Sequence, residues 1–321
     1  MDLKESLLKD DFGNILISLQ KLLPKKKEPF FFEFDKATLT RLSDVHLEAK
    51  SVFPKCFVGA KLVILRQIMD KVKLMQNYSF GKTKESYKCY SHLLYKETDN
   101  KNVDDGLLID STGSAIATYK EKTDDFEMRL TSKIKDVVSS ETEIVFEKES
   151  DKSIGSISCS MKDVDPITLS LVAQWMYKIR PELSVGSEFG IRPLSHPISP
   201  QLSFSARYER SSFTLSSTLS RVGFQVCIYK KFSPDLRIAT IFNEGNKDLP
   251  ASVGVALHKS FENGSELKMF VDSQKCGGFT YERDIVFQES HNDVRVIRLM
   301  ASTLIDRQKR VRLGFGFNLD F

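Results

Sequence analysis

The chain has 321 residues, of which 41% are hydrophobic and 28% are charged, and its formal net charge is +4. This composition excludes a disordered protein, and the basic excess is too small and too dispersed to indicate nucleic-acid binding. No run of 18 apolar residues is present, which excludes transmembrane helices. It does not exclude transmembrane strands, since such a strand needs only about ten residues with every second one apolar.

The sequence contains none of the motifs that mark common active sites. It has no phosphate-binding G-x-x-x-x-G-K-[ST], no dinucleotide-binding glycine pattern and no G-x-S-x-G nucleophile motif. Its five cysteines are far apart and its histidines form no metal-binding pair, so we expect reduced thiols, no metal and no cofactor. Acidic residues near the N-terminus argue against a secretory signal and against a cleaved mitochondrial presequence. We therefore expect a protein that is not an enzyme.

The N-terminal part of the chain has helical character. Residues 1–35 predict a partly helical segment whose leucines recur loosely up to Pro24, where a basic linker, PKKKEP, begins. A second helix is predicted over 36–54, with Asp35 as its N-cap and Pro54 at its end. Its apolar residues at helical spacing are Leu39, Leu42, Val45, Ala49 and Val52.

Two interpretations of this second helix remain open. It packs on a core, or it lines or plugs a hollow structure. We interpret His46 as a residue on the helix surface with no implied partner.

After Pro54 the apolar residues recur every second position, which is the period of a β-strand. Turn-forming stretches such as ETDNKN, KESDKS and NEGNKD divide this region into 19 predicted strands of similar length. The predicted strands are 57–67, 71–81, 86–96, 104–110, 113–121, 126–134, 140–149, 154–162, 167–178, 181–191, 200–208, 212–219, 221–231, 234–243, 250–258, 265–272, 277–286, 294–305 and 309–320.

The alternation gives each predicted strand one apolar and one polar face. In 140–149, Ile144 and Phe146 share one face, and the glutamates at 141, 143, 147 and 149 share the other. The final stretch, RVRLGFGFNLDF at 310–321, alternates without a break up to the last residue. Chain ends usually fray, so this regularity indicates an end that is paired with a neighbour.

Nineteen consecutive strands favour closure into an up-and-down barrel over residues 55–321. A soluble sandwich needs about 100 residues, so this region would form two or three sandwiches with linkers, and the sequence shows no such linker. Open sheets rarely exceed about ten strands, whereas a wide closed barrel leaves a water-filled channel. The polar faces would line that channel and the apolar faces would meet lipid. A soluble multi-sandwich interaction protein remains the alternative.

Three stretches resemble the channel-forming subunits of the mitochondrial outer-membrane translocase, a family within the eukaryotic porin superfamily. LSDVHLEAKSVFPKCFVGAKLVI at 42–64 is similar to the short helix, the V-F-P and the first strand of that family. LLIDSTGSAIATY at 107–119 is similar to one of its hairpins. The last strand resembles the sorting signal of mitochondrial barrels, with Arg312, Gly314, Phe317 and Leu319 in its defined positions.

This resemblance implies a multi-pass barrel of about 19 strands in the mitochondrial outer membrane, with the helix at 36–54 inside the lumen. It implies a passive channel that imports unfolded precursor proteins. The implied partners are those precursors, receptor and small helical translocase subunits, further copies of the barrel and membrane lipid, but no nucleic acid.

Presequences are basic amphipathic helices, so acidic patches in the lumen suit them. By strand parity we place Glu141, Glu143, Glu147 and Glu188 in the lumen as a candidate presequence-binding track. The alternative is that these are solvated charges that offset neighbouring lysines. A metabolite porin like the voltage-dependent anion channel is the rival function, although it would start its helix near the N-terminus and favour a strongly basic lumen.

Overall fold

The computed structural model describes the following residues of the unit Leu39–Phe321: 40–69, 72–81, 88–95, 106–110, 113–123, 125–135, 139–163, 165, 168–191, 200–221, 223–245, 251–290 and 293–320. The predicted segment 1–35, the first four residues of the predicted helix and Phe321 lie outside the described residues.

The described chain forms 19 strands, as predicted from the alternation. Each predicted segment coincides with one observed strand, with ends that differ by a few residues. The strands are β1 (Gly59–Met69), β2 (Val72–Phe80), β3 (Lys88–Tyr95), β4 (Gly106–Asp110), β5 (Ala115–Lys122), β6 (Phe126–Lys135), β7 (Ser139–Glu149), β8 (Ser153–Lys162), β9 (Ser170–Arg180), β10 (Leu183–Ile191), β11 (Gln201–Arg210), β12 (Phe213–Ser220), β13 (Gly223–Ser233), β14 (Leu236–Gly245), β15 (Ser252–Ser260), β16 (Ser265–Asp272), β17 (Gly277–Ser290), β18 (Asp293–Ile305) and β19 (Val311–Asp320).

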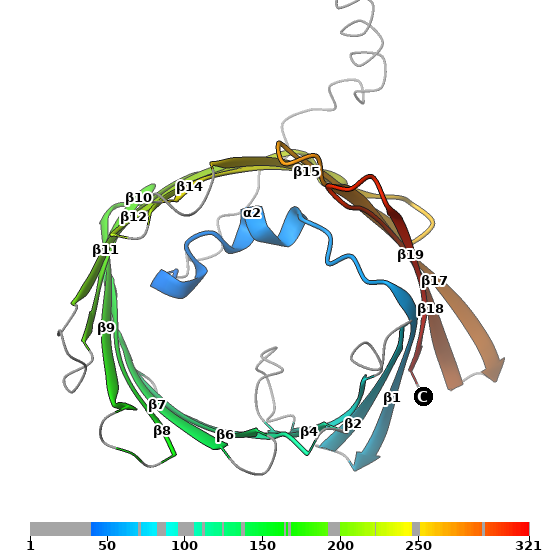
Figure 1. The fold of residues 1–321 in the computed structure, drawn as a ribbon, viewed down its shortest axis with the longest axis horizontal. Helices are drawn as coiled ribbons and strands as arrows, with labels where there is room; N and C mark the ends of the chain where they lie inside the picture. The colour runs from blue at the N-terminus through cyan, green and yellow to red at the C-terminus, as the bar shows by residue number, and fades with distance from the viewer. Residues whose placement is uncertain are drawn as a thin grey trace, which may run out of the picture. The chain divides into compact units, whose positions relative to one another are not determined.

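The strands close into a single barrel (Figure 1). Consecutive strands pair antiparallel, and β19 returns to pair with β1 in parallel, from Gly59 opposite Gly314 to Leu65 opposite Asp320. The parallel seam is a consequence of the odd number, because the first and nineteenth strands of an up-and-down series run in the same direction. The strands form one closed sheet, so the alternative of several soluble sandwiches is wrong.

The two faces of the wall follow the predicted parity. On β19, Val311, Leu313, Phe315 and Phe317 are 50–62% exposed on the outside, whereas Gly314 is buried on the inside. On β6 and β7, the exposed apolar residues Leu130 and Phe146 point outward, while neighbouring acids point into the lumen. The described part of the chain has no helix of the length and apolarity needed to cross a membrane.

The helical part is shorter than predicted. A 3-10 turn, η1 (Leu42–Asp44), precedes an α-helix, α2 (Leu47–Val52), and both lie inside the barrel ring (Figure 1). The prediction of one continuous helix was wrong at His46, whose φ of −107° and ψ of 10° interrupt it. The prediction that His46 lies on a helix surface without partners was also wrong, because its side chain is buried against the barrel wall.

Candidate functional site: the lumen and its inner segment

Residues 41–57, which we call the inner segment, follow the inside of the wall from β6 to β19. Its contacts in chain order are those of Arg41 with β6 and β7, Leu42 with β10, His46 with β12, Glu48 with β11, Ala49 and Val52 with β13 to β15, Phe53 with β16, and Phe57 with β18 and β19. In this part of the barrel, the inner segment therefore covers the strands and lines the lumen.

Small side chains on the wall make room for the inner segment. Ala49 and Val52 of α2 form one buried cluster with Cys227, Ala239 and Ala256 on three adjacent strands. Two glycines on the wall make room for the inner segment in the same way. A Cβ on Gly254 would lie 3.1 Å from the Phe53 ring, and one on Gly186 would lie 2.6 Å from Cδ1 of Leu42. Because interiors are close-packed, larger residues here would displace the inner segment.

His46 and Glu48 fix the inner segment by polar contacts. The His46 ring nitrogens lie 2.7 Å from Oγ of Ser216 and 2.8 Å from Oγ1 of Thr218. Burial lowers the pKa of His46 to about 4, and the cations Lys50 and Arg207 act in the same direction. The imidazole is therefore neutral near pH 7, with one ring nitrogen able to donate and the other able to accept.

Arg207 of β11 is the most deeply buried cation in contact with the inner segment. Its side chain is only 3% exposed. Its guanidinium donates to both carboxylate oxygens of Glu48, to the carbonyl oxygen of Val45 at 3.1 Å, and to Glu209 at 2.9 Å. A buried guanidinium with several acceptors has partners for its N–H donors, and its planar shape restricts where those partners can lie.

A polar row crosses five strands opposite the start of the inner segment. Glu127, Glu147, Ser156, Gln174 and Glu188 occupy matching register positions on β6 to β10. The Gln174 amide donates to Glu188 at 2.7 Å, and the Ser156 hydroxyl donates to Gln174 at 3.3 Å. Hydrogen bonds therefore join Ser156, Gln174 and the predicted track residue Glu188. Glu147, another track residue, is the register neighbour of Ser156.

Arg41 binds the other end of this row. Its Nε donates to Glu147 at 2.7 Å and its Nη2 donates to Glu127 at 2.9 Å. Glu127 also contacts Lys120 at 3.3 Å and Arg129 at 3.0 Å, and its side chain is 8% exposed. Arg41 and Glu127 were not predicted as site residues, because partners more than 80 positions apart leave no local pattern in the sequence.

Glu143 and Glu141 lie farther along β7. Glu143 lines a cavity of about 450 Å³ between the inner segment and the wall, together with Arg41, Asp44, Glu127 and Glu147. Glu141 stands between Lys133 and Lys162 in the strand register. All four predicted track residues therefore face the lumen, and Glu141 is the one flanked by lysines.

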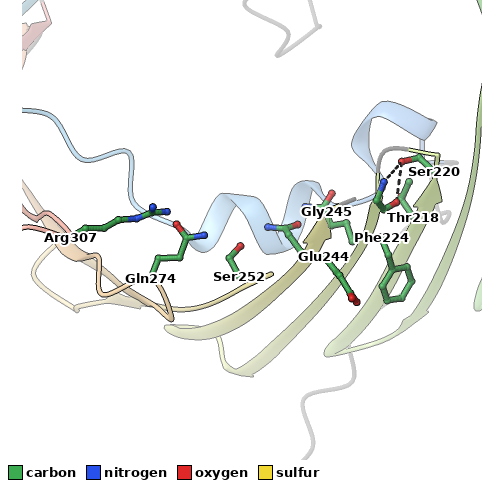
Figure 2. A pocket seen from close by; sticks show the side chains of 11 residues that line it. Thr218, Ser220, Phe224, Glu244, Gly245, Ser252, Gln274 and Arg307 are labelled. Atoms are coloured by element: carbon green, nitrogen blue, oxygen red, sulfur yellow. Dashed lines mark hydrogen bonds between the residues drawn. The ribbon is translucent and has the colours of Figure 1, made fainter. Parts of the chain in front are cut away.

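A second cavity of about 630 Å³ lies at the ends of β12 to β15 (Figure 2). In Figure 2, Arg307 lies at one end of this cavity, Ser220 and Thr218 lie at the other end, and Glu244 lies between them. Ser220 is hydrogen-bonded to the backbone of Gly223. Within the described part of the chain, no group of His, Cys, Asp and Glu could hold a metal ion. The labelled side chains of this cavity are spread along its length in Figure 2.

The four residues of the predicted sorting signal lie on both faces of β19. Arg312 lies 3.1 Å from Asp306, and Gly314 lies against the inner segment, where a Cβ would be 2.4 Å from the carbonyl oxygen of Phe57. Phe317 is half exposed on the outer face. Gly314 thus permits a close approach of two backbone segments.

Comparisons with known proteins assign the chain that forms this barrel to a family. The model of the eukaryotic porin family matches residues 40–291. The chain belongs to the eukaryotic porin family. It is similar to the mitochondrial import receptor subunit TOM40 homologues of Caenorhabditis elegans and Caenorhabditis briggsae. Each is 22% identical over 253 residues, which cover 75% of this chain and 82% of the relative. The family and these relatives support a channel of the mitochondrial outer membrane.

Proposed function

We propose that this porin is a protein-conducting channel, through which unfolded precursor proteins cross the mitochondrial outer membrane. The relatives named as import receptor subunits support this proposal. A channel for extended polypeptide needs a polar wall with modest attraction at several places. It carries out no chemical step, so it works without catalytic residues.

The observation that carries the proposal is the acidic arc of the lumen on β7 to β10. We propose that Glu141, Glu143, Glu147 and Glu188 attract the basic face of a presequence. Three of them, Glu143, Glu147 and Glu188, lie in or next to the cavity and polar row opposite the inner segment. A focused negative potential in a narrow polar channel raises the local concentration of a cationic peptide.

The test is block of single-channel current by a basic presequence peptide. The wild-type barrel should be blocked, and Glu141→Lys/Glu143→Lys/Glu147→Lys should weaken the blocking affinity by about tenfold or more, since each reversal replaces an attraction by a repulsion. The same peptide with its basic residues replaced by glutamine is the matched control. An affinity that the triple reversal leaves unchanged would contradict the acidic track.

The rival within the family is a metabolite porin. Such a channel would pass small anions and would show no preference for the basic peptide over its glutamine control. The same measurement therefore separates the two functions.

We further propose that the barrel assembles with receptor and small helical subunits, with further copies of itself and with lipid around its apolar outer face. Arg312, Gly314, Phe317 and Leu319 of the last strand would form the sorting signal that the machinery for barrel assembly in the membrane recognises. Aromatic and aliphatic residues on alternate positions of β19 support a lipid-facing surface.

A further inference from the structure

The acid pair Glu127 and Glu147 is occupied by a cation from the chain itself. Arg41 places two different guanidinium nitrogens on two carboxylates that belong to adjacent strands. These carboxylates are directly opposite one another in the β6–β7 register. Two facing carboxylates repel each other, so a cation between them lowers the energy of the pair.

The surroundings of Arg41 favour a cation from any source. Apart from Arg41, the charged residues that line the adjoining cavity are four acids and one base: Asp44, Glu127, Glu143, Glu147 and Arg129. Lys120 adds a second base that contacts Glu127 at 3.3 Å, so acids still outnumber bases around Arg41. The Arg41 side chain is 28% exposed, whereas the carboxylates that hold it are 8% and 12% exposed. The two carboxylates are thus fixed in the wall, whereas the Arg41 side chain approaches them from the lumen.

Arg41 lies at the start of the inner segment, and the later contacts do not depend on it. His46, Glu48 and Phe57 are fixed to β12, β11 and β18 by their own hydrogen bonds. The Arg41 side chain can therefore leave the acid pair while α2 stays in place.

We propose that Arg41 is an internal ligand of a guanidinium-binding site made by Glu127 and Glu147, and that a basic peptide must displace it to bind there. The identity of the incoming peptide rests on the proposed function, whereas the site itself does not. The internal guanidinium reduces the apparent affinity for an external one to the fraction of that affinity given by the time for which the pair is free. Self-occupancy would keep the channel's attraction for cargo modest, so that bound peptides can leave.

The first experiment tests the site without a peptide. Purified Arg41→Ala barrels are placed in planar bilayers, and ethylguanidinium is added to fill the vacated position. Because α2 stays in place, Arg41→Ala leaves Glu127 and Glu147 without the Arg41 guanidinium, and the variant should be more cation-selective than the wild type in its reversal potential. Millimolar ethylguanidinium should reverse this gain in Arg41→Ala alone. Equal reversal potentials for the two proteins, or no difference in their response to ethylguanidinium, would overturn the proposal.

The second experiment measures block by the basic peptide in the wild type, Arg41→Gln and Arg237→Gln. Arg237 is an inward-facing residue of β14, away from the acid pair, so its substitution removes the same charge from the lumen. Arg41→Gln should tighten the block by roughly tenfold, as expected if the internal ligand occupies the pair about nine-tenths of the time. Arg237→Gln should change it much less.

The outcomes separate the two proposals. If the peptide blocks the wild type, and Arg41→Gln and Arg237→Gln tighten this block equally, the internal-ligand proposal is overturned. The import function then still stands. Failure of the peptide to block any of the three barrels would count against the import function. In that case the ethylguanidinium experiment alone decides whether Glu127 and Glu147 form the site.

Discussion

The guanidinium of Arg207 on β11 binds the carboxylate of Glu48 on α2, so one buried ion pair joins the barrel wall to the inner segment. These residues are 159 positions apart in the chain. The alternating pattern of the strands predicted the wall. The sequence left open where the helix lies, and this ion pair fixes it against the wall.

Breaking this pair should loosen α2. Glu48→Gln should lower the free energy of docking of the inner segment by about 2 kcal/mol, as for loss of a hydrogen-bonded charge. Arg207→Met should cost more, about 3 kcal/mol, because it removes the hydrogen bond to the Val45 carbonyl oxygen as well as both bonds to Glu48. Hydrogen exchange at the amides of Lys50 and Phe53, which are bonded within α2, reports the docking. A double variant whose loss equals the sum of the single losses would show that the two side chains do not interact.

Docking of the inner segment should weaken as the pH falls below 6.5. Burial lowers the pKa of His46 to about 4, so an undocked His46 with an ordinary pKa binds a proton first. The stabilisation is complete above pH 6.5 and is lost as the pH falls towards 4. Between pH 7 and pH 5 the open fraction should rise roughly twentyfold, measured by the same exchange after correction for intrinsic rates.

His46→Gln is the control for this pH dependence. Glutamine can donate and accept hydrogen bonds to Ser216 and Thr218 but does not titrate. The charged groups that act on His46 are Lys50, Arg207 and Glu48, and the glutamine variant keeps all three. A glutamine variant with the same pH dependence as the wild type would assign the effect to another group.

Gly314 should be needed for the seam between β19 and β1. A Cβ there would lie 2.4 Å from the backbone oxygen of Phe57, and backbone cannot rotate away. Gly314→Ala should destabilise the barrel by about 1–3 kcal/mol, the usual cost of overpacking, and lower its unfolding temperature in detergent. At Gly316 the nearest atoms would be 3.1 Å away, so Gly316→Ala should have a smaller effect. Equal effects of the two substitutions would contradict the packing role.

Phe317 gives a cleaner test of the sorting signal than Gly314, because its side chain points outward and does not hold the inner segment. Phe317→Asp should leave the imported protein unassembled in the intermembrane space. Phe315→Asp is the matched control, since it puts the same charge on the same face of β19 outside the signal positions. Blue-native electrophoresis after import into isolated mitochondria checks both. Assembly defects of equal size would show that the charge on the outer face matters and the signal does not.

The sequence predicted the repeated part of the structure well. Strand number and face follow from the two-residue period, which is a local property that each strand carries in its own residues. The parity of Glu141, Glu143, Glu147 and Glu188 followed for the same reason. The sequence did not predict the break at His46, because a helical period of apolar residues continues across it. The contacts of Arg41 and Arg207 depend on barrel closure, which sets the neighbours of residues that are far apart in the chain.

The central claim is that polypeptide passes through the lumen. A photo-reactive amino acid replaces Ser158 or Ile157, neighbouring residues of β8, of which Ser158 lines the inner cavity and Ile157 is 58% exposed outside. A precursor is then arrested in transit by a folded domain at its C-terminus, and the barrel is irradiated. A protein-conducting channel predicts a precursor adduct from position 158 and none from position 157. Absence of an adduct from position 158, or equal adducts from both positions, would contradict the account.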